Sequence, residues 1–255
     1  MKMKKIFTIL IALCTLTGAY AQGFGHRAAG INEMEIGDRI DFEVLSYLHF
    51  GFNGIVKNDD LSGKTSFFNS QQFGFNMVEL AFRPYESGKI SLGADVEWNW
   101  FHLNKDYVWV PLSEGSSSPF TSGGTRLGIF PKELAGVREV KRSIFSVCTF
   151  GFPINFTQRF GKGAFQLGVT PELNLNGYVQ FKGTNLMGES IDEMRSGARY
   201  TKNINTNNFS FNVHAAISYG GLGLYFKYRP LNVVKENYGP QFNTFTVGLV
   251  LGIGV

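Results

Sequence analysis

The ionisable side chains of this sequence stand mostly at alternate positions within apolar stretches. In Ile90 to Trp100, ISLGADVEWNW, the carboxylates Asp95 and Glu97 alternate with the apolar Val96 and Trp98. Successive side chains of a β-strand point to opposite faces, so both carboxylates would share one face. The same alternation predicts one polar network, made of the residues Asp41, Glu43, His49, Glu79, Arg83, Asp95, Glu97, Glu172, His214, Lys227 and Arg229.

Charge pairing is the chemistry that these residue types support. Buried carboxylates are costly without partners, so we expect the acids of the network to pair with its Arg, Lys and His members. Tyr47, Tyr178 and neighbouring asparagines would supply further hydrogen bonds. The network carries more acidic than basic residues, so it would favour cations if a path led through it.

The sequence contains no recognisable catalytic or metal-binding motif. HExxH, CxxC, GxSxG and a phosphate-binding glycine loop are all absent from it. His102 is followed by Ser113 and by Ser116 to Ser118, the residue types of some lipid-modifying hydrolases, but without a matching spacing. We therefore expect no catalytic residue, no cofactor and no metal ion.

The first residues predict export from the cytoplasm. Lys2, Lys4 and Lys5 precede an apolar run that ends in small residues at Ala21, which is typical of a cleaved signal peptide over residues 1–21. Its removal would leave Cys148 as the single cysteine, so no internal disulfide is expected. It would also leave 21 Lys plus Arg against 20 Asp plus Glu, a balance that argues against nucleic-acid binding.

Period-two alternation predicts eight strands in the remaining chain. A change of phase at Met77 and Val78 predicts either a β-bulge in the second of them or an apolar residue turned inward. Their apolar faces would include Ile144, Val179, Phe181 and Ile253. The predicted strands are Arg39–Asn53, Gln72–Arg83, Ile90–Asn104, Ser143–Gln158, Ala164–Phe181, Asn208–Tyr219, Leu222–Pro230 and a last one that carries Phe245 to Val255.

The connections between these strands alternate in length. Short ones fall at 84–89, 159–163 and 220–221, and long ones at about 54–71, 105–142, 182–207 and 231–241. All short turns then lie at one end of the strands and all long loops at the other. Within the loops, Ser190 and Glu193 have the spacing of a helix capping box. The basic run Val137 to Arg142 would extend the fourth strand outward.

These strands and connections make the chain similar to the small eight-stranded outer-membrane barrels of the OmpA-transmembrane-domain and OmpX type. It also resembles the family of outer-membrane β-barrel domain proteins that includes PorT-like members. The resemblance covers Arg39 to Val255 and rests on pattern and topology. It implies an outer-membrane location, insertion by the barrel-assembly machinery, and an interior filled by side chains. Such barrels usually end in an aromatic residue, whereas this sequence ends in Val255.

The expected fold is an all-β, eight-stranded antiparallel up-and-down transmembrane β-barrel with short periplasmic turns and long extracellular loops. The expected organisation is a signal peptide at 1–21, a periplasmic segment at 22–38 and the barrel at 39–255. Apolar strand faces would meet lipid, and polar faces would meet the interior.

The expected role is structural or surface-interacting, with a lumen plugged by polar side chains because eight strands leave no wide channel. The partners expected are outer-membrane lipid and lipopolysaccharide, the barrel-assembly machinery, and envelope proteins that the loops would contact. Three alternatives stay open. They are a small-solute channel or uptake accessory, a lipid A-modifying enzyme, and a soluble lipocalin-like barrel with its apolar faces turned inward.

Overall fold

The computed structural model describes residues 40–44, 47–56, 61, 63–112, 126–192 and 204–253. It gives no side-chain description for residues 41–44, 176, 191 and 192. The predicted signal peptide at 1–21, the predicted segment at 22–38 and Val255 lie outside the described residues.

All secondary-structure elements in the described ranges are β-strands, and all their pairings are antiparallel. In this part of the chain no helix is long and apolar enough to cross a membrane. The thirteen strands are β1 (Ile40–Val44), β2 (Leu48–Val56), β3 (Gln71–Tyr85), β4 (Gly88–His102), β5 (Tyr107–Leu112), β6 (Arg126–Pro131), β7 (Val137–Gly151), β8 (Ile154–Phe160), β9 (Gly163–Asn185), β10 (Ser190–Asp192), β11 (Phe209–Tyr219), β12 (Leu222–Arg229) and β13 (Asn243–Leu251).

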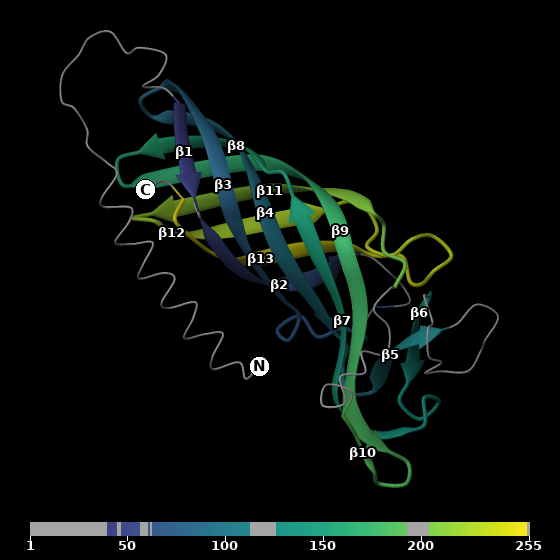
Figure 1. Ribbon diagram of the computed structural model, residues 1–255. Coiled ribbons are helices and arrows are strands. Elements are labelled where there is room, and N and C mark those ends of the chain that lie inside the picture. Colours follow the sequence, from purple (N-terminus) through teal and green to yellow (C-terminus); the bar gives the residue numbers. More distant parts are fainter. Residues whose placement is uncertain are drawn as a thin grey trace. The chain divides into compact units, whose positions relative to one another are not determined.

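Ten of these strands form a closed ring with eight strand positions. β1 and β2 lie end to end along β3, and β7 and β8 lie end to end between β4 and β9. The positions follow one another as β1/β2, β3, β4, β7/β8, β9, β11, β12 and β13, and β13 pairs back with β2. Figure 1 shows these strands side by side, with β7 and β9 extending beyond the others toward β10. The eight predicted strands are thus confirmed, two of them as broken strands.

The outer surface of the ring is apolar. Leu92 is 53% exposed and Leu224 is 59% exposed, while their polar neighbours in sequence point inward. Period-two alternation therefore separates two environments, with apolar side chains outside, as predicted for Ile90 to Trp100. This orientation is the reverse of a lipocalin-like barrel. Other exposed apolar residues of the ring strands include Phe50, Leu80, Phe82, Ile90, Ile154, Phe156, Leu167, Leu173, Ile217, Phe226, Val247 and Leu249.

Irregular residues in two long strands change which face a side chain takes. The register between β3 and β4 shifts between Asn76 and Val78, which confirms the predicted bulge. A second shift lies in β9, where Asn174 and Asn176 pair with the consecutive residues Thr149 and Cys148. An extra residue inverts the phase beyond it.

That second bulge overturns part of the predicted outer face. Val179 and Phe181, predicted to face outward, are buried with 0% and 1% exposure. Tyr178, expected among the interior partners, falls on the opposite phase from Val179. Ile144, also predicted to face outward, is fully buried, between the register partners His102 and Gln180.

Connections alternate in length as predicted. β3–β4, β8–β9 and β11–β12 are joined by two-residue turns, at 86–87, 161–162 and 220–221. Gly161, Gly220 and Gly221 have positive φ, which tight hairpin turns require. β7 begins at Val137, so the basic run extends the strand outward as expected. The predicted helix start at Ser190 is wrong, because Ser190 to Asp192 form β10 and pair with β9.

The loop end of the ring is closed by an apolar cluster, here called the loop-end plug, which the sequence did not predict. Trp109 of the β5–β6 hairpin is fully buried in it. Its backbone N–H donates to Ser143 Oγ at 2.8 Å, and its indole N–H donates to the Phe101 carbonyl at 2.9 Å. The plug consists of Leu61, Phe101, Leu103, Trp109, Leu127, Phe145, Val147, Val179, Ile204, Val233, Val234 and Phe242.

Truncating Trp109 tests whether this plug contributes to stability. We expect Trp109→Ala to lower the free energy of unfolding by about 3–5 kcal/mol, because it leaves a large cavity among packed rings. Leu186→Ala, at a side chain that is 65% exposed, is the control. That variant should change the same quantity by less than about 0.5 kcal/mol. Urea unfolding followed by far-UV circular dichroism measures both, and equal effects would contradict the role of the plug.

Candidate functional site: the polar interior of the ring

Glu97 of β4 forms the centre of a polar network that fills the middle of the ring. Its side chain is 1% exposed and forms an ion pair with Lys227 of β12. His49 Nε2 of β2 lies 3.2 Å from Glu97 Oε1. Gln72 Nε2 of β3 donates to Glu97 Oε2 at 2.6 Å, and Tyr225 OH donates to Gln72 Oε1 at 2.7 Å. One carboxylate therefore connects four strand positions of the ring.

Glu172 of β9 is a second buried carboxylate with cationic and amide partners. It accepts a hydrogen bond from the Asn212 amide of β11, and Arg229 NH1 lies 3.8 Å from its Oε2. The same guanidinium donates to Ser210 Oγ at 2.7 Å and to Asn174 Oδ1 at 2.8 Å. Arg229 of β12 is thus held by partners from two other strands, β9 and β11.

The remaining predicted residues lie closer to the short turns. Glu79 of β3 pairs with Lys89 of β4, with Nζ and Oε1 at 3.0 Å. His214 Nε2 of β11 lies 2.9 Å from Asn155 Oδ1 of β8. Asp95 is 3% exposed, and no ion pair with it is found among the described side chains.

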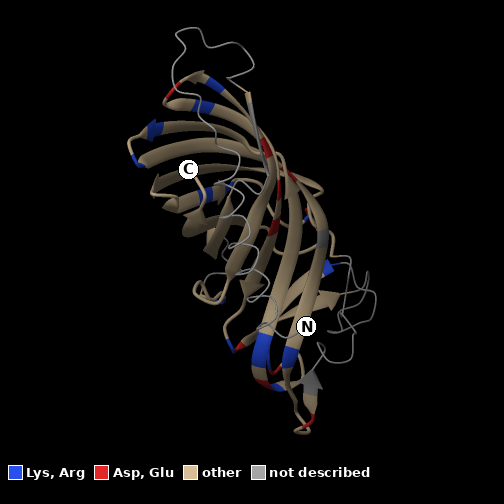
Figure 2. Ribbon diagram, turned by 60° about the vertical axis from the view of Figure 1, so that its left-hand side comes forward, with Lys and Arg blue, Asp and Glu red and all other residues tan. Residues whose placement is uncertain are grey.

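For three predicted network residues the described contacts give no place in this arrangement. The backbones of Asp41 and Glu43 pair with Ala81 and Glu79, but the side chains of both acids lie outside the described residues. Arg83 is half-buried near the β3–β4 turn. Figure 2 shows acidic residues partway along the strands and basic residues near the ends of the ring.

Several uncharged residues also belong to the network, and the prediction included the asparagines among them but not Gln72, Tyr225 or Thr246. Asn53 Nδ2 donates to Asn99 Oδ1 at 3.2 Å, and Thr246 Oγ1 donates to Asn53 Oδ1 at 2.6 Å. Gln72 and Tyr225 join Glu97 in the same way. All of these residues occupy inward-facing positions of their strands. The alternation of each strand could therefore have identified them.

Glycines on neighbouring strands make room for the imidazoles. A Cβ atom at Gly74 would clash with the His49 ring, and one at Gly168 would clash with the His214 ring. Both glycines stand on the inward phase of β3 and β9. A glycine within a strand often marks such a close approach.

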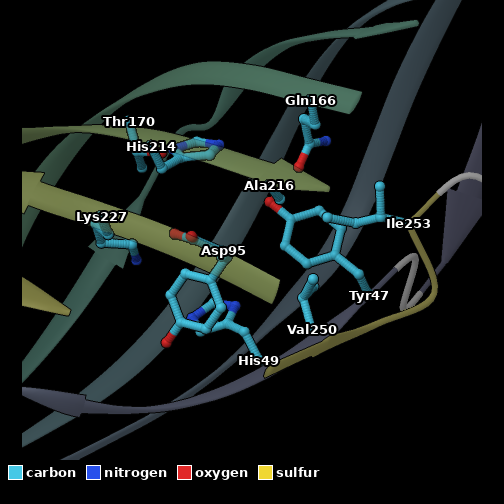
Figure 3. Close-up of a pocket in the computed structure, with 11 residues that line it drawn as sticks. Tyr47, His49, Asp95, Gln166, Thr170, His214, Ala216, Lys227, Val250 and Ile253 are labelled. Carbon is cyan, nitrogen blue, oxygen red and sulfur yellow. The ribbon is translucent and has the colours of Figure 1, made fainter. Parts of the chain in front are cut away.

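Little space remains inside the ring. One cavity of about 20 Å³ is lined by residues that include Tyr47, His49, Asp95, His214 and Ile253. Figure 3 shows their side chains projecting toward it from different strands. A second cavity of about 10 Å³ lies beside Glu97, Glu172 and Arg229. Spaces of about 10–15 Å³ hold one water molecule, so each of these two cavities has room for one or two water molecules at most.

The side chains that the structure describes contain no group of three or more His, Cys, Asp or Glu positioned to hold a metal ion. His102 lies at the loop end of β4, on the outward phase. Ser113 and Ser116 to Ser118, considered with it above, lie outside the described residues. The described residues of this site hold buried carboxylates next to buried cationic side chains.

The sequence matches no protein-family model and no curated protein.

Removing the central carboxylate tests this network. We expect Glu97→Gln to lower the free energy of unfolding by about 3–5 kcal/mol, because Lys227 is left buried without its counter-charge. Replacing both partners, in Glu97→Gln with Lys227→Met, should recover much of that loss. Urea unfolding of both single variants and the double variant gives the coupling energy.

An exposed carboxylate provides the matched control. Asp106 accepts a hydrogen bond from Lys132 Nζ at 3.0 Å and thereby raises the pKa of this lysine. Because the pair is exposed to water, Asp106→Asn should leave stability unchanged within error. A loss from Glu97→Gln no larger than that from Asp106→Asn would contradict the network described here.

Proposed function

We propose that the chain is an integral outer-membrane protein in which the ring is a transmembrane β-barrel. The observation that carries the proposal is the apolar outer surface of the ring around a buried charged interior. In water such an exterior would be an unusually large apolar patch. In a bilayer it would meet acyl chains, and the closed hydrogen bonding of the ring would leave few backbone groups without partners.

The connections favour one orientation in that membrane. Short turns would lie in the periplasm and long loops outside the cell, as is usual for outer-membrane barrels. Aromatic side chains gather near the loop end, where Phe67 contacts Phe52, Phe68 and Phe245. Aromatic rings are enriched at membrane–water interfaces, so this cluster supports an interface at that level.

The proposed role is structural or surface-interacting, without catalysis. The loop-end plug fills one end of the described ring, and the two cavities beside the polar network are small, which supports a closed lumen. The long loops would contact envelope proteins, and Arg138 and Lys141, both exposed, would face lipopolysaccharide phosphates. The barrel-assembly machinery would insert the chain after removal of its signal peptide.

The second candidate is a small-solute channel or uptake accessory. One observation favours it. Glu79, Asp95, Glu97 and Glu172 are buried, whereas Lys89, Lys227 and Arg229 are the buried Lys and Arg side chains among the described residues. An acidic lining of this kind would select cations if the lumen opened.

Electrophoresis of the membrane fraction with and without boiling tests the proposed barrel. We expect a shift in mobility on boiling, because a closed β-barrel stays folded in detergent until it is heated. Protease added to intact cells should cleave only within the long loops and leave the turns at 86–87, 161–162 and 220–221 intact. Recovery of the protein in the soluble periplasm would refute the membrane location.

Conductance in planar lipid bilayers separates the two candidates. We expect the purified protein to give no stable openings, because side chains fill the described interior. Regular openings that select cations over anions would favour the channel instead. A variant in which residues 107–131 are replaced by a short Gly-Ser linker should also stay closed. It removes Trp109 and Leu127 from the loop-end plug but leaves the polar network around Glu97 intact.

A further inference from the structure

The wall of the ring is closed differently at its two ends. Toward the loops, β2 and β13 pair along the whole length of Leu48 to Val56. Toward the short turns, β1 pairs with β3, and no described residue pairs with its other edge. Among the described residues, the strand ladder is therefore incomplete between β1 and the end of β13, a region here called the seam.

The chain turns away from the seam directly after β13. Gly252 has a φ of 105°, and its N–H donates to the Gly221 carbonyl at 2.7 Å. The Ile253 carbonyl accepts a hydrogen bond from Ser218 Oγ at 2.9 Å, and its side chain is 5% exposed. The sequence predicted Ile253 on the outer face, which is wrong, because Gly252 redirects the chain toward β11 and β12.

Side chains fill the space behind the seam. Tyr47 and Ile253 pack with Val250 and with Tyr225 in an apolar group, here called the turn-end plug, which also contains Ala164 and Ala216. Among the described residues, the seam is thus closed by side-chain packing. Packing of this kind can open locally without breaking a strand ladder.

The 20 Å³ cavity lies directly against this plug. Tyr47, Val250 and Ile253 line one part of it, and His49, Asp95, His214 and Lys227 line another (Figure 3). Asp95 Oδ1 and His214 Nδ1 are buried atoms for which the described residues provide no hydrogen-bond partner. Buried polar atoms normally have partners, so this cavity offers an apolar wall and unused hydrogen-bonding atoms together.

We propose that the seam is a lateral opening into the ring, closed by Ile253 and Tyr47, and that the cavity behind it binds a small amphipathic molecule. The apolar end of this ligand would take the place of the Ile253 side chain. Its other end would carry a hydrogen-bond donor, a hydroxyl or an amine, for the carboxylate of Asp95. The site is independent of the membrane location proposed above.

Cysteine labelling tests the opening. In a Cys148→Ser background, Ala216→Cys places a thiol in the cavity wall, where Ala216 is 4% exposed. We expect N-ethylmaleimide to label it slowly when Ile253 is present, and at least tenfold faster after Ile253→Ala. Leu251→Ala, a truncation of similar size on the outer face, should leave the rate unchanged.

A second reporter distinguishes local opening from general loosening. Val147→Cys lies in the loop-end plug, and its labelling rate should be the same with Ile253 and with Ile253→Ala. If Ile253→Ala does not give the heat-dependent mobility shift of a folded ring, Ile253→Val replaces it, with a smaller increase expected. An unchanged rate at Ala216→Cys in a folded variant, or faster labelling at both reporters, would overturn the lateral opening.

Protection of the same thiol tests the ligand class. Hexylamine and hexanol should each slow labelling of the Ile253→Ala, Ala216→Cys variant severalfold, and hexanoate should not. Asp95→Asn should remove the advantage of hexylamine over hexanoate. Equal protection by all three probes would overturn the donor-bearing ligand. Labelling in detergent solution needs no outer membrane, so its outcome is separate from the outcome of the fractionation experiment.

Discussion

Closure of the strand ladder is the constraint on which the rest of the structure depends. β13 pairs with β2, so the sheet has an inside and an outside, and each residue of a ring strand faces one or the other. Inside, space is limited, and Glu79, Glu97 and Glu172 each pair with a cationic side chain from another strand. Outside, the side chains share one continuous surface, and it is apolar. The pairing of β13 with β2 therefore separates the charged interior from the apolar exterior.

The interior satisfies this constraint through partners that are distant in sequence. Glu97 and Lys227 come from β4 and β12, and Glu172 and Arg229 come from β9 and β12. Each pair would be costly if either member were buried alone. The apolar plugs at both ends keep the pairs away from bulk water, which strengthens their attraction. The polar and the apolar layers thus depend on each other.

The alternation of side chains predicts the structure correctly where it continues along a strand. It predicts wrongly where a bulge or a loop interrupts it. The ring strands, the short turns and the inward phase of Glu97, Glu172 and Lys227 all follow from alternation. Val179 and Phe181 were misplaced because a bulge in β9 adds one residue. The loop-end plug was missed because Trp109 reaches it from a loop hairpin, where no period indicates the direction of a side chain. Gln72 was not predicted, because the expected network consisted of ionisable residues, tyrosines and asparagines.

At the seam, the described wall of the ring is closed by side-chain packing and not by backbone hydrogen bonds. Elsewhere around the ring, opening the wall requires breaking a ladder of backbone hydrogen bonds between neighbouring strands. At the seam, the opening proposed above displaces, among the described residues, only the side chains of Tyr47 and Ile253, because β13 ends at Leu251 and the chain then turns inward. Local opening free energies are lowest where few backbone bonds must break. Hydrogen exchange should accordingly be faster in β1 than in β2, although both strands pair with β3.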